Sequence, residues 1–269
     1  METIVRFGPQ DQLVGVLCEP DGGSRGPLLV LPSAGLQPRF GPFRLHVELA
    51  RRLARSGVRT FRFDVPGVGE ANRLNGCGPH EATLAALDVL APRHGGEGFV
   101  VGGVCSAADI AWNIAVADAR VRGVLMLDGL SFGGPWFQWA KIMGVLRRSP
   151  LQWPGVIARM FQRARTQERG PVMADYREWP TREQAQQEFA RLVQREVHSL
   201  WVYTGGYATT FQHPRQFAWS FGDVARDRRV TMVFWPDCDH TFFARSHRDR
   251  LLDTVDQWLG AAFASPGRA

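Results

Sequence analysis

The sequence predicts one α/β domain with a mostly parallel, doubly wound sheet that is interrupted by a helical insertion. Short apolar runs bounded by Gly or Pro alternate with segments of helical spacing, as in 27–32 and then 43–56. Such runs suit strands buried on both faces of a parallel sheet, and right-handed crossovers give the doubly wound topology. The alternation stops inside 131–198, which has helical periodicity and several Trp residues. We therefore assign 1–130 and 199–269 to the core and 131–198 to a helical cap.

The individual elements follow in order from local patterns. A turn at Gly8-Pro9 separates the first two strands, and Gly57 ends the first helix, in which Leu45 and Leu49 stand at helical spacing. The expected strands are 3–7, 12–18, 27–32, 58–63, 98–102, 123–127, 200–204 and 230–235. The expected helices are 43–56, 81–90, 106–116, 214–224 and 248–263.

Composition excludes several classes of protein. The 269 residues are 45% apolar and 22% charged, which is ordinary usage for a globular chain with a sizeable core. The four cysteines have no CxxC spacing, which argues against a zinc ribbon or a disulfide framework. There is no secretory signal pattern at the N-terminus and no apolar run of about 18 residues, so we expect a cytoplasmic protein without a membrane span.

The net charge of +6 does not indicate a nucleic-acid surface, because most arginines are dispersed rather than gathered on one face. One group of arginines in the predicted cap is denser than the rest. It either forms a solvated helical face or meets an acidic partner, such as a phosphopantetheine carrier or coenzyme A. The group consists of Arg147, Arg148, Arg159, Arg163, Arg165 and Arg169.

The segment around Cys105 reads as a strand, a tight turn and a helix, which is the setting of a catalytic nucleophile. A nucleophile on such a strained turn needs small residues two places before and after it. Gly103 and Ala107 satisfy this for Cys105, whereas Ser106 as the nucleophile would place branched Val104 in the turn. A thiol at the start of a helix also feels the helix dipole, which lowers its pKa. The sequence therefore favours Cys105, with Ser106 as the alternative.

A histidine and a carboxylate are expected at the same edge of the sheet. His240 follows the last strand and precedes the last helix, where a loop can bring an imidazole over the strand ends. The strand 200–204 is followed by Gly205-Gly206-Tyr207, which offers no carboxylate. We therefore predict that Asp128, at the end of the preceding strand, orients His240. Two further carboxylates lie close by in the sequence and are expected to shape the histidine loop, namely Asp237 and Asp239.

Backbone N–H groups beside the nucleophile would form an oxyanion hole. One expected donor is the N–H of Ser106, the residue after Cys105. The second would come from the small residues Ala34 and Gly35 in the loop after the strand 27–32.

With these residues and motifs, the chain resembles the α/β-hydrolase superfamily over nearly its whole length. It is most similar to the lidded, serine-aminopeptidase-like hydrolases found near exopolysaccharide genes, the exosortase-associated type, and near natural-product genes. The matching stretches are 40–44, 49–54, 62–69, 103–107 and 239–242. The resemblance implies an α/β-hydrolase fold, a nucleophile–histidine–acid triad, no metal and no organic cofactor. Two departures from the common pattern are Cys for Ser and the missing acid at Tyr207.

The predicted activity is transfer of an acyl group through a thioester on Cys105 to water or another acceptor, as a hydrolase or an acyltransferase. The substrate would be a small acyl compound, free or linked to a carrier protein or coenzyme A. The tryptophans Trp136, Trp139 and Trp153 of the cap either pack the cap onto the sheet or line an apolar acyl pocket. A non-catalytic binding protein with this fold and a serine hydrolase that uses Ser106 are the alternatives.

Overall fold

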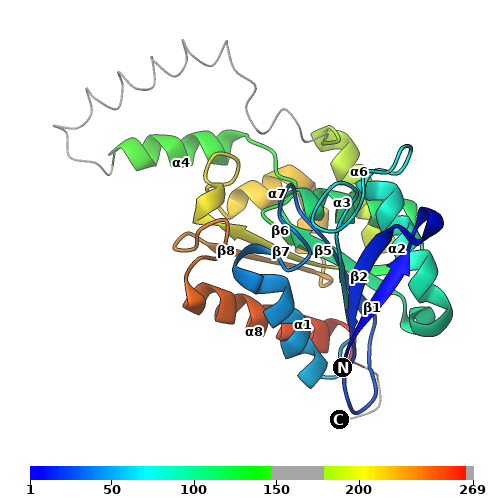
Figure 1. Cartoon of the computed structure of the whole chain (residues 1–269). Helices are drawn as coiled ribbons and strands as arrows, with labels where there is room; N and C mark the ends of the chain where they lie inside the picture. Colours follow the sequence, from blue (N-terminus) through cyan, green and yellow to red (C-terminus); the bar gives the residue numbers. More distant parts are fainter. Residues whose placement is uncertain (147–178, 265–269) are drawn as a thin grey trace.

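Eight strands within the described residues, 1–146 and 179–264, form one sheet in the computed structural model of the chain (Figure 1). Their order across the sheet is β1-β2-β4-β3-β5-β6-β7-β8. The pairs β1–β2 and β2–β4 are antiparallel, and all other neighbours are parallel. The strands are β1 (Glu2–Phe7), β2 (Leu13–Cys18), β3 (Leu28–Pro32), β4 (Thr60–Phe63), β5 (Phe99–Val104), β6 (Val121–Leu127), β7 (His198–Thr204) and β8 (Val230–Trp235).

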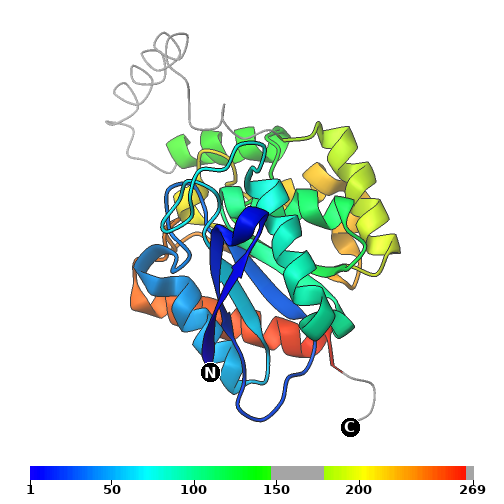
Figure 2. The ribbon, with the colours of Figure 1, turned by 45° about the vertical axis from the view of Figure 1, so that its right-hand side comes forward.

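Helices cover both faces of this sheet (Figures 1 and 2). Helices α1 and α8 pack on one face, and α2, α3, α6 and α7 pack on the other, so that successive residues of the central strands point into two separate cores. The helices are α1 (Leu45–Arg55), α2 (Pro79–His94), α3 (Ser106–Ala117), α4 (Pro135–Leu146), α6 (Arg182–Gln194), α7 (Arg215–Phe221) and α8 (Arg245–Ala262). None of the helices within the described ranges has the length and apolarity that crossing a membrane requires.

This architecture confirms the predicted mostly parallel, doubly wound sheet, and each expected strand is found within three residues of its predicted ends. The first helix differs at its start. The sequence predicts a helix over 43–56, but α1 begins at Leu45, because Phe43 (φ 50°) and Arg44 (φ 62°) have left-handed backbone conformations. Residues in that region cannot continue a right-handed helix. The residues Pro42–Arg44 form a tight turn before the helix instead.

The predicted cap, 131–198, is described only in part. Its segment 147–178, which holds Trp153 and the predicted arginine group, lies outside the described residues. Helix α6, near the end of the segment, packs against the sheet layer, since Phe189 contacts Trp112 and Trp201 with ring centroids 5.6 and 5.5 Å apart. The Trp112 indole also donates to Glu188 of α6 (2.7 Å). Helix α6 is thus one of the helices that cover the sheet, and the division into core and cap stays a prediction.

The buried histidine of α1 gives the fold a pH dependence. Burial lowers the pKa of His46 to about 4, below the ordinary value of about 6.5 that it has in the unfolded chain. As pH falls from about 6.5 to 4, the unfolded state gains a proton that the folded state does not, so folding stability falls. We expect this histidine to remove on the order of 2–3 kcal/mol of the unfolding free energy over that window.

Urea unfolding at a series of pH values would measure this loss. In His46→Leu, the fall in unfolding free energy between pH 6.5 and 4 should be smaller than in the native chain, because one titrating group is gone. Parallel pH curves for the two proteins would show that His46 does not titrate in this way.

Candidate active site

Cys105 occupies the sharp turn between β5 and α3. Its backbone has φ 58° and ψ −120°, and it directly precedes the first residue of the helix, Ser106. A β-carbon on Gly103 would lie 2.5 Å from the β-carbon of Ala107, so the turn tolerates only glycine at that position. The strained residue at the centre of the turn is therefore Cys105 and not Ser106, as the small residues Gly103 and Ala107 on either side predict. The Cys105 side chain is partly exposed and packs at the edge of the core formed with α1 and α8.

The structure brings His240 and Asp128 together at the same edge of the sheet. His240 lies in the loop between β8 and α8, and its Nδ1 is 2.8 Å from Oδ2 of Asp128. Asp128 follows β6 directly, has φ 50°, and is completely buried. Since β5 and β6 are parallel neighbours, Cys105 and Asp128 stand at adjacent strand ends, and the Cys105 N–H donates to the carbonyl of Leu127 (2.8 Å).

Thr204, at the end of β7, holds the Asp128 carboxylate in place. The backbone N–H of Thr204 donates to Oδ1 (2.7 Å), and its hydroxyl donates to Oδ2 (2.6 Å). With His240 as the third donor, both carboxylate oxygens are engaged, as a buried carboxylate requires. Asp128 is thus fixed by one neighbouring strand and turned toward the histidine loop.

These contacts raise the pKa of His240 to about 9. The largest cause is the hydrogen bond to Asp128, the next is a side-chain hydrogen bond to Cys105, and partial burial acts in the opposite direction. Because Nδ1 faces Asp128, Nε2 is the ring nitrogen left for the Cys105 thiol. The imidazole is therefore placed between a carboxylate and a thiol, and its charged form is favoured at neutral pH.

The histidine loop lies directly against the backbone of the loop after β7, which carries no acid. A β-carbon on Gly206 would lie 2.1 Å from the backbone nitrogen of His240, and the Gly206 N–H donates to the carbonyl of Cys238 (3.0 Å). Tyr207 then stacks on the His240 ring, with centroids 5.8 Å apart and planes 15° from parallel. Sequence reasoning missed the roles of Thr204, Gly206 and Tyr207, although the Gly205-Gly206 pair signalled a close backbone approach.

The expected oxyanion loop does reach the nucleophile turn, but one of its predicted donors is already used. The N–H of Gly35 donates to the hydroxyl oxygen of Ser106 (2.9 Å). Gly35 is therefore not placed as an oxyanion donor in this conformation. Ala34, whose carbonyl accepts from Gln37 (2.9 Å), stays the predicted second donor, together with the N–H of Ser106 in the first turn of α3. The bond to Gly35 also gives the Ser106 hydroxyl a structural role.

The two described tryptophans of the predicted pocket belong to an aromatic cluster beside α7. Trp136 stacks on His213, with centroids 5.2 Å apart and planes 14° from parallel, and the Arg215 guanidinium lies 4.7 Å from the Trp136 ring. Trp139 meets the same histidine edge-on at 5.4 Å. These contacts dock α4 onto the chain before α7. A role for Trp136, Trp139 and Trp153 in binding substrate stays a prediction.

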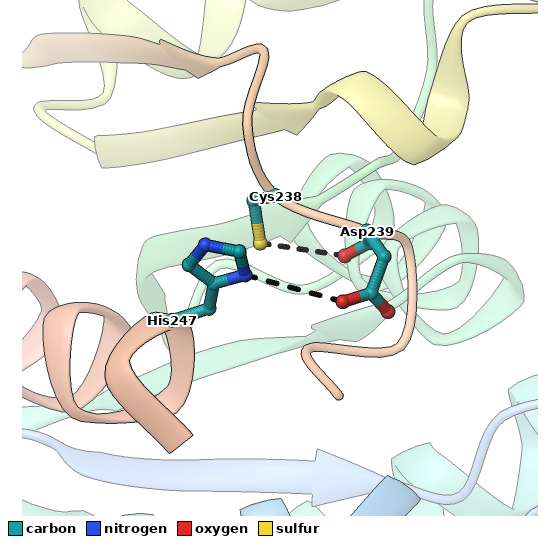
Figure 3. Close-up of side chains that lie close together, drawn as sticks. All are labelled: Cys238, Asp239 and His247. Carbon is teal, nitrogen blue, oxygen red and sulfur yellow. Dashed lines mark hydrogen bonds and ion pairs between the residues drawn. The ribbon is translucent and has the colours of Figure 1, made fainter. Parts of the chain in front are cut away.

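The side chains of Cys238, Asp239 and His247 face one another next to His240 in the sequence and at the start of α8 (Figure 3). Their potential ligand atoms lie within 4.8 Å of one another, which is the composition of a small metal site. However, the Asp239 carboxylate already accepts from the N–H and hydroxyl of Thr241 (2.9 and 2.6 Å) and from the N–H of Phe243 (2.9 Å). Burial also raises the pKa of the Cys238 thiol to about 12. We therefore assign Asp239 to shaping the histidine loop, as its position in the sequence predicts.

The described chain has the α/β-hydrolase fold. Among similar solved structures, an α/β serine hydrolase homologue from Coxiella burnetii is 16% identical, with 96% of each chain covered and a TM-score of 0.58. An α/β serine hydrolase without a lid from Xanthomonas campestris is 13% identical, with 100% of this chain and 97% of that chain covered and a TM-score of 0.56. An esterase from Pyrococcus furiosus is 10% identical, with coverage of 98% and 92% and a TM-score of 0.59.

No protein-family model matches the chain, and no curated protein matches its sequence. At identities this low, the likeness to solved structures establishes the fold alone.

Proposed function

We propose that this chain is an enzyme that forms an acyl-thioester on Cys105 and transfers the acyl group to water or another acceptor. The observation that carries the proposal is the placement of the strained Cys105 beside His240, whose other ring nitrogen is bonded to the buried Asp128. Neighbours of the same fold that are called serine hydrolases or esterases support acyl chemistry of this general class. A cysteine in place of the serine is a feature of this chain.

In the first step, the Cys105 thiolate attacks the carbonyl carbon of an ester or thioester. A carbon–sulfur bond forms, and the carbonyl electrons move to the oxygen, which the backbone N–H of Ser106 and the loop after β3 would stabilise. When the carbonyl re-forms, the bond to the leaving alkoxide or thiolate breaks. His240 gives its Nε2 proton to that group, and Asp128 holds the ring in position.

In the second step, water, an alcohol or an amine attacks the thioester. Neutral His240 takes the proton of the incoming group, the carbon–sulfur bond breaks, and Cys105 leaves as the thiolate beside the renewed imidazolium. Thioesters react readily with amines as well as with water, so the same site serves hydrolysis or acyl transfer. The substrate in this proposal is a small acyl compound, free or bound to a carrier protein or coenzyme A.

Intact-protein mass spectrometry after exposure to an activated acyl ester would test the proposal. We expect one acyl adduct on the native chain and on Ser106→Ala, and none on Cys105→Ala. Neutral hydroxylamine should remove the adduct, because it cleaves thioesters much faster than oxygen esters. A hydroxylamine-resistant adduct that survives Cys105→Ala and disappears in Ser106→Ala would identify a serine hydrolase instead. Absence of any adduct on the native chain would favour a non-catalytic binding protein.

A further inference from the structure

Large apolar side chains are exposed on the two loops that adjoin the proposed catalytic residues. The loop between β3 and α1 exposes Leu36 (91%), Phe40 (45%) and Phe43 (49%), and the loop between β8 and α8 exposes Phe243 (68%). Exposed aromatic groups that gather at one place mark binding surfaces more often than single exposed side chains do. Phe43 and Phe243 come from segments 200 residues apart in the sequence, and the fold brings these two rings into contact.

We call the contacting pair Phe43 and Phe243 the aromatic rim. Their ring centroids are 5.2 Å apart and the ring planes meet at 78°. Both residues make this contact while they stay exposed to solvent, Phe43 to 49% and Phe243 to 68%. Because the two rings are already packed edge to face, the apolar surface that they offer exists before a ligand binds.

The backbone around the rim is held in conformations that aromatic residues rarely adopt. Phe43 has φ 50°, Arg44 has φ 62°, and Phe242 has φ 55°. Non-glycine residues in the left-handed region cost free energy, and they persist where the surrounding structure fixes them, often at functional sites. Cys105 and Asp128 share this property at the same edge of the sheet.

Arg248 of α8 is the group that fixes the rim. Its Nη1 donates to the carbonyls of Phe242 (3.0 Å) and Phe243 (2.6 Å), and its guanidinium lies 5.7 Å from the ring centre of Phe43. The backbone of Phe243 has a second partner, since its N–H donates to the carboxylate of Asp239, which is drawn in Figure 3. The exposed position of Phe243 is therefore set by three hydrogen bonds of its own segment.

We propose that the aromatic rim binds an apolar acyl chain of the substrate, which rests on the function proposed above. Both loops lead directly to the reacting groups. Phe243 comes three residues after His240, and the loop that ends at Phe43 contains Gly35, which is bonded to Ser106 beside Cys105. An acyl group carried by the Cys105 sulfur would therefore begin at the edge of the sheet that these two loops border. Two rings give an area far below the roughly 1,200 Å² of a stable protein interface, so they suit a chain better than a protein partner.

The test is the affinity of the full-length chain for decanoate relative to acetate, measured by isothermal titration calorimetry. Neither carboxylate acylates a thiol, so binding is read apart from chemistry. We expect the native chain to bind decanoate more tightly, and Phe43→Ala or Phe243→Ala to weaken decanoate binding by about five- to tenfold through lost apolar contact. Phe243→Leu should restore most of that affinity. Ile4→Ala, which removes a similarly exposed apolar side chain (72%) from the distant strand β1, is the matched control.

Three results would overturn the inference: no preference for decanoate in the native chain, unchanged affinity in both rim variants, or an equal loss in Ile4→Ala. A rim that serves a protein partner would give the second of these. The proposed function fails separately, through the missing Cys105 adduct in mass spectrometry. An acylated Cys105 together with rim-independent decanoate binding would leave the function standing and remove the rim from it.

Discussion

His240→Ala is expected to slow the alkylation of Cys105 by iodoacetamide at pH 7 by about tenfold. The pKa of His240 is raised to about 9, so the ring is positively charged at pH 7 and favours the thiolate form of Cys105. Without that charge a smaller fraction of Cys105 should be thiolate at pH 7, and the neutral thiol is a poor nucleophile. The greater intrinsic nucleophilicity of the more basic thiolate offsets part of the loss.

The effect on turnover of an activated ester should be larger, on the order of 10²–10⁴-fold, because in the proposed reaction His240 also exchanges the proton with the leaving group and the acceptor. The pH profiles separate the two contributions. In His240→Ala the alkylation rate should rise at higher pH than in the native chain, because the thiolate has lost the neighbouring positive charge. Peptide mass spectrometry after timed alkylation gives the rate at Cys105 itself.

The chain supplies its own reference thiols for this measurement. Burial raises the pKa of Cys18, Cys77 and Cys238, so these thiols should react slowly in both proteins. His80→Ala, on α2, is the matched histidine control. An unchanged rate and profile at Cys105 in His240→Ala would show that the ring does not activate the thiol, which is what a non-catalytic binding protein predicts.

Local sequence patterns predict the strands and the nucleophile turn because the physical constraints there are local. Buried parallel strands need short apolar runs, and the turn at Cys105 needs Gly103 and Ala107, whose closeness leaves no room for a larger residue. Asp128 could be predicted as the partner of His240 only from its place at a strand end. Its contact with His240 is observed, and its part in catalysis stays a prediction.

The supporting residues could not be predicted because they depend on register between strands. Leu127 pairs with Val202, and the Asp128 N–H donates to the Val202 carbonyl (2.9 Å), which brings Thr204 to the Asp128 carboxylate. A shift of one residue would turn the Thr204 hydroxyl to the other face of the sheet. The hydrogen bond from the Gly35 N–H to Ser106 could not be predicted either, because no sequence pattern relates the two segments that it joins.

Asp128→Asn is expected to lower turnover by on the order of 10²–10⁴-fold, as loss of a histidine-orienting carboxylate does in triads. The Asp128 carboxylate accepts from three donors, whereas an asparagine side chain has one acceptor oxygen and an NH₂ group that must face a donor. Whichever way the amide turns, Thr204 or His240 loses its partner. The pKa of His240 should then fall from about 9 toward its ordinary value of about 6.5.

The same change has a signed effect on stability. Because the folded pKa of His240 lies above the unfolded value, the contact with Asp128 contributes stability that is fully present below about pH 6.5 and is lost as pH rises through about 9. Urea unfolding from pH 6 to 10 should therefore show a decline in the native chain that flattens in Asp128→Asn. Thr204→Val, which removes only the hydroxyl donor, should change both turnover and slope in the same direction by less.

Joint measurement of turnover and stability distinguishes a positioning carboxylate from one that only supports the fold. If Asp128→Asn loses folding stability as expected but keeps its turnover within about threefold of the native chain, Asp128 has a structural role alone. An orienting carboxylate affects the rate far more than threefold. If turnover falls and the His240 titration moves together with it, the carboxylate after β6 acts on the reaction through the imidazole. In that case Asp128 takes the place of the acid that the loop after β7 lacks. The register between β6 and β7 places Thr204 where it holds the Asp128 carboxylate.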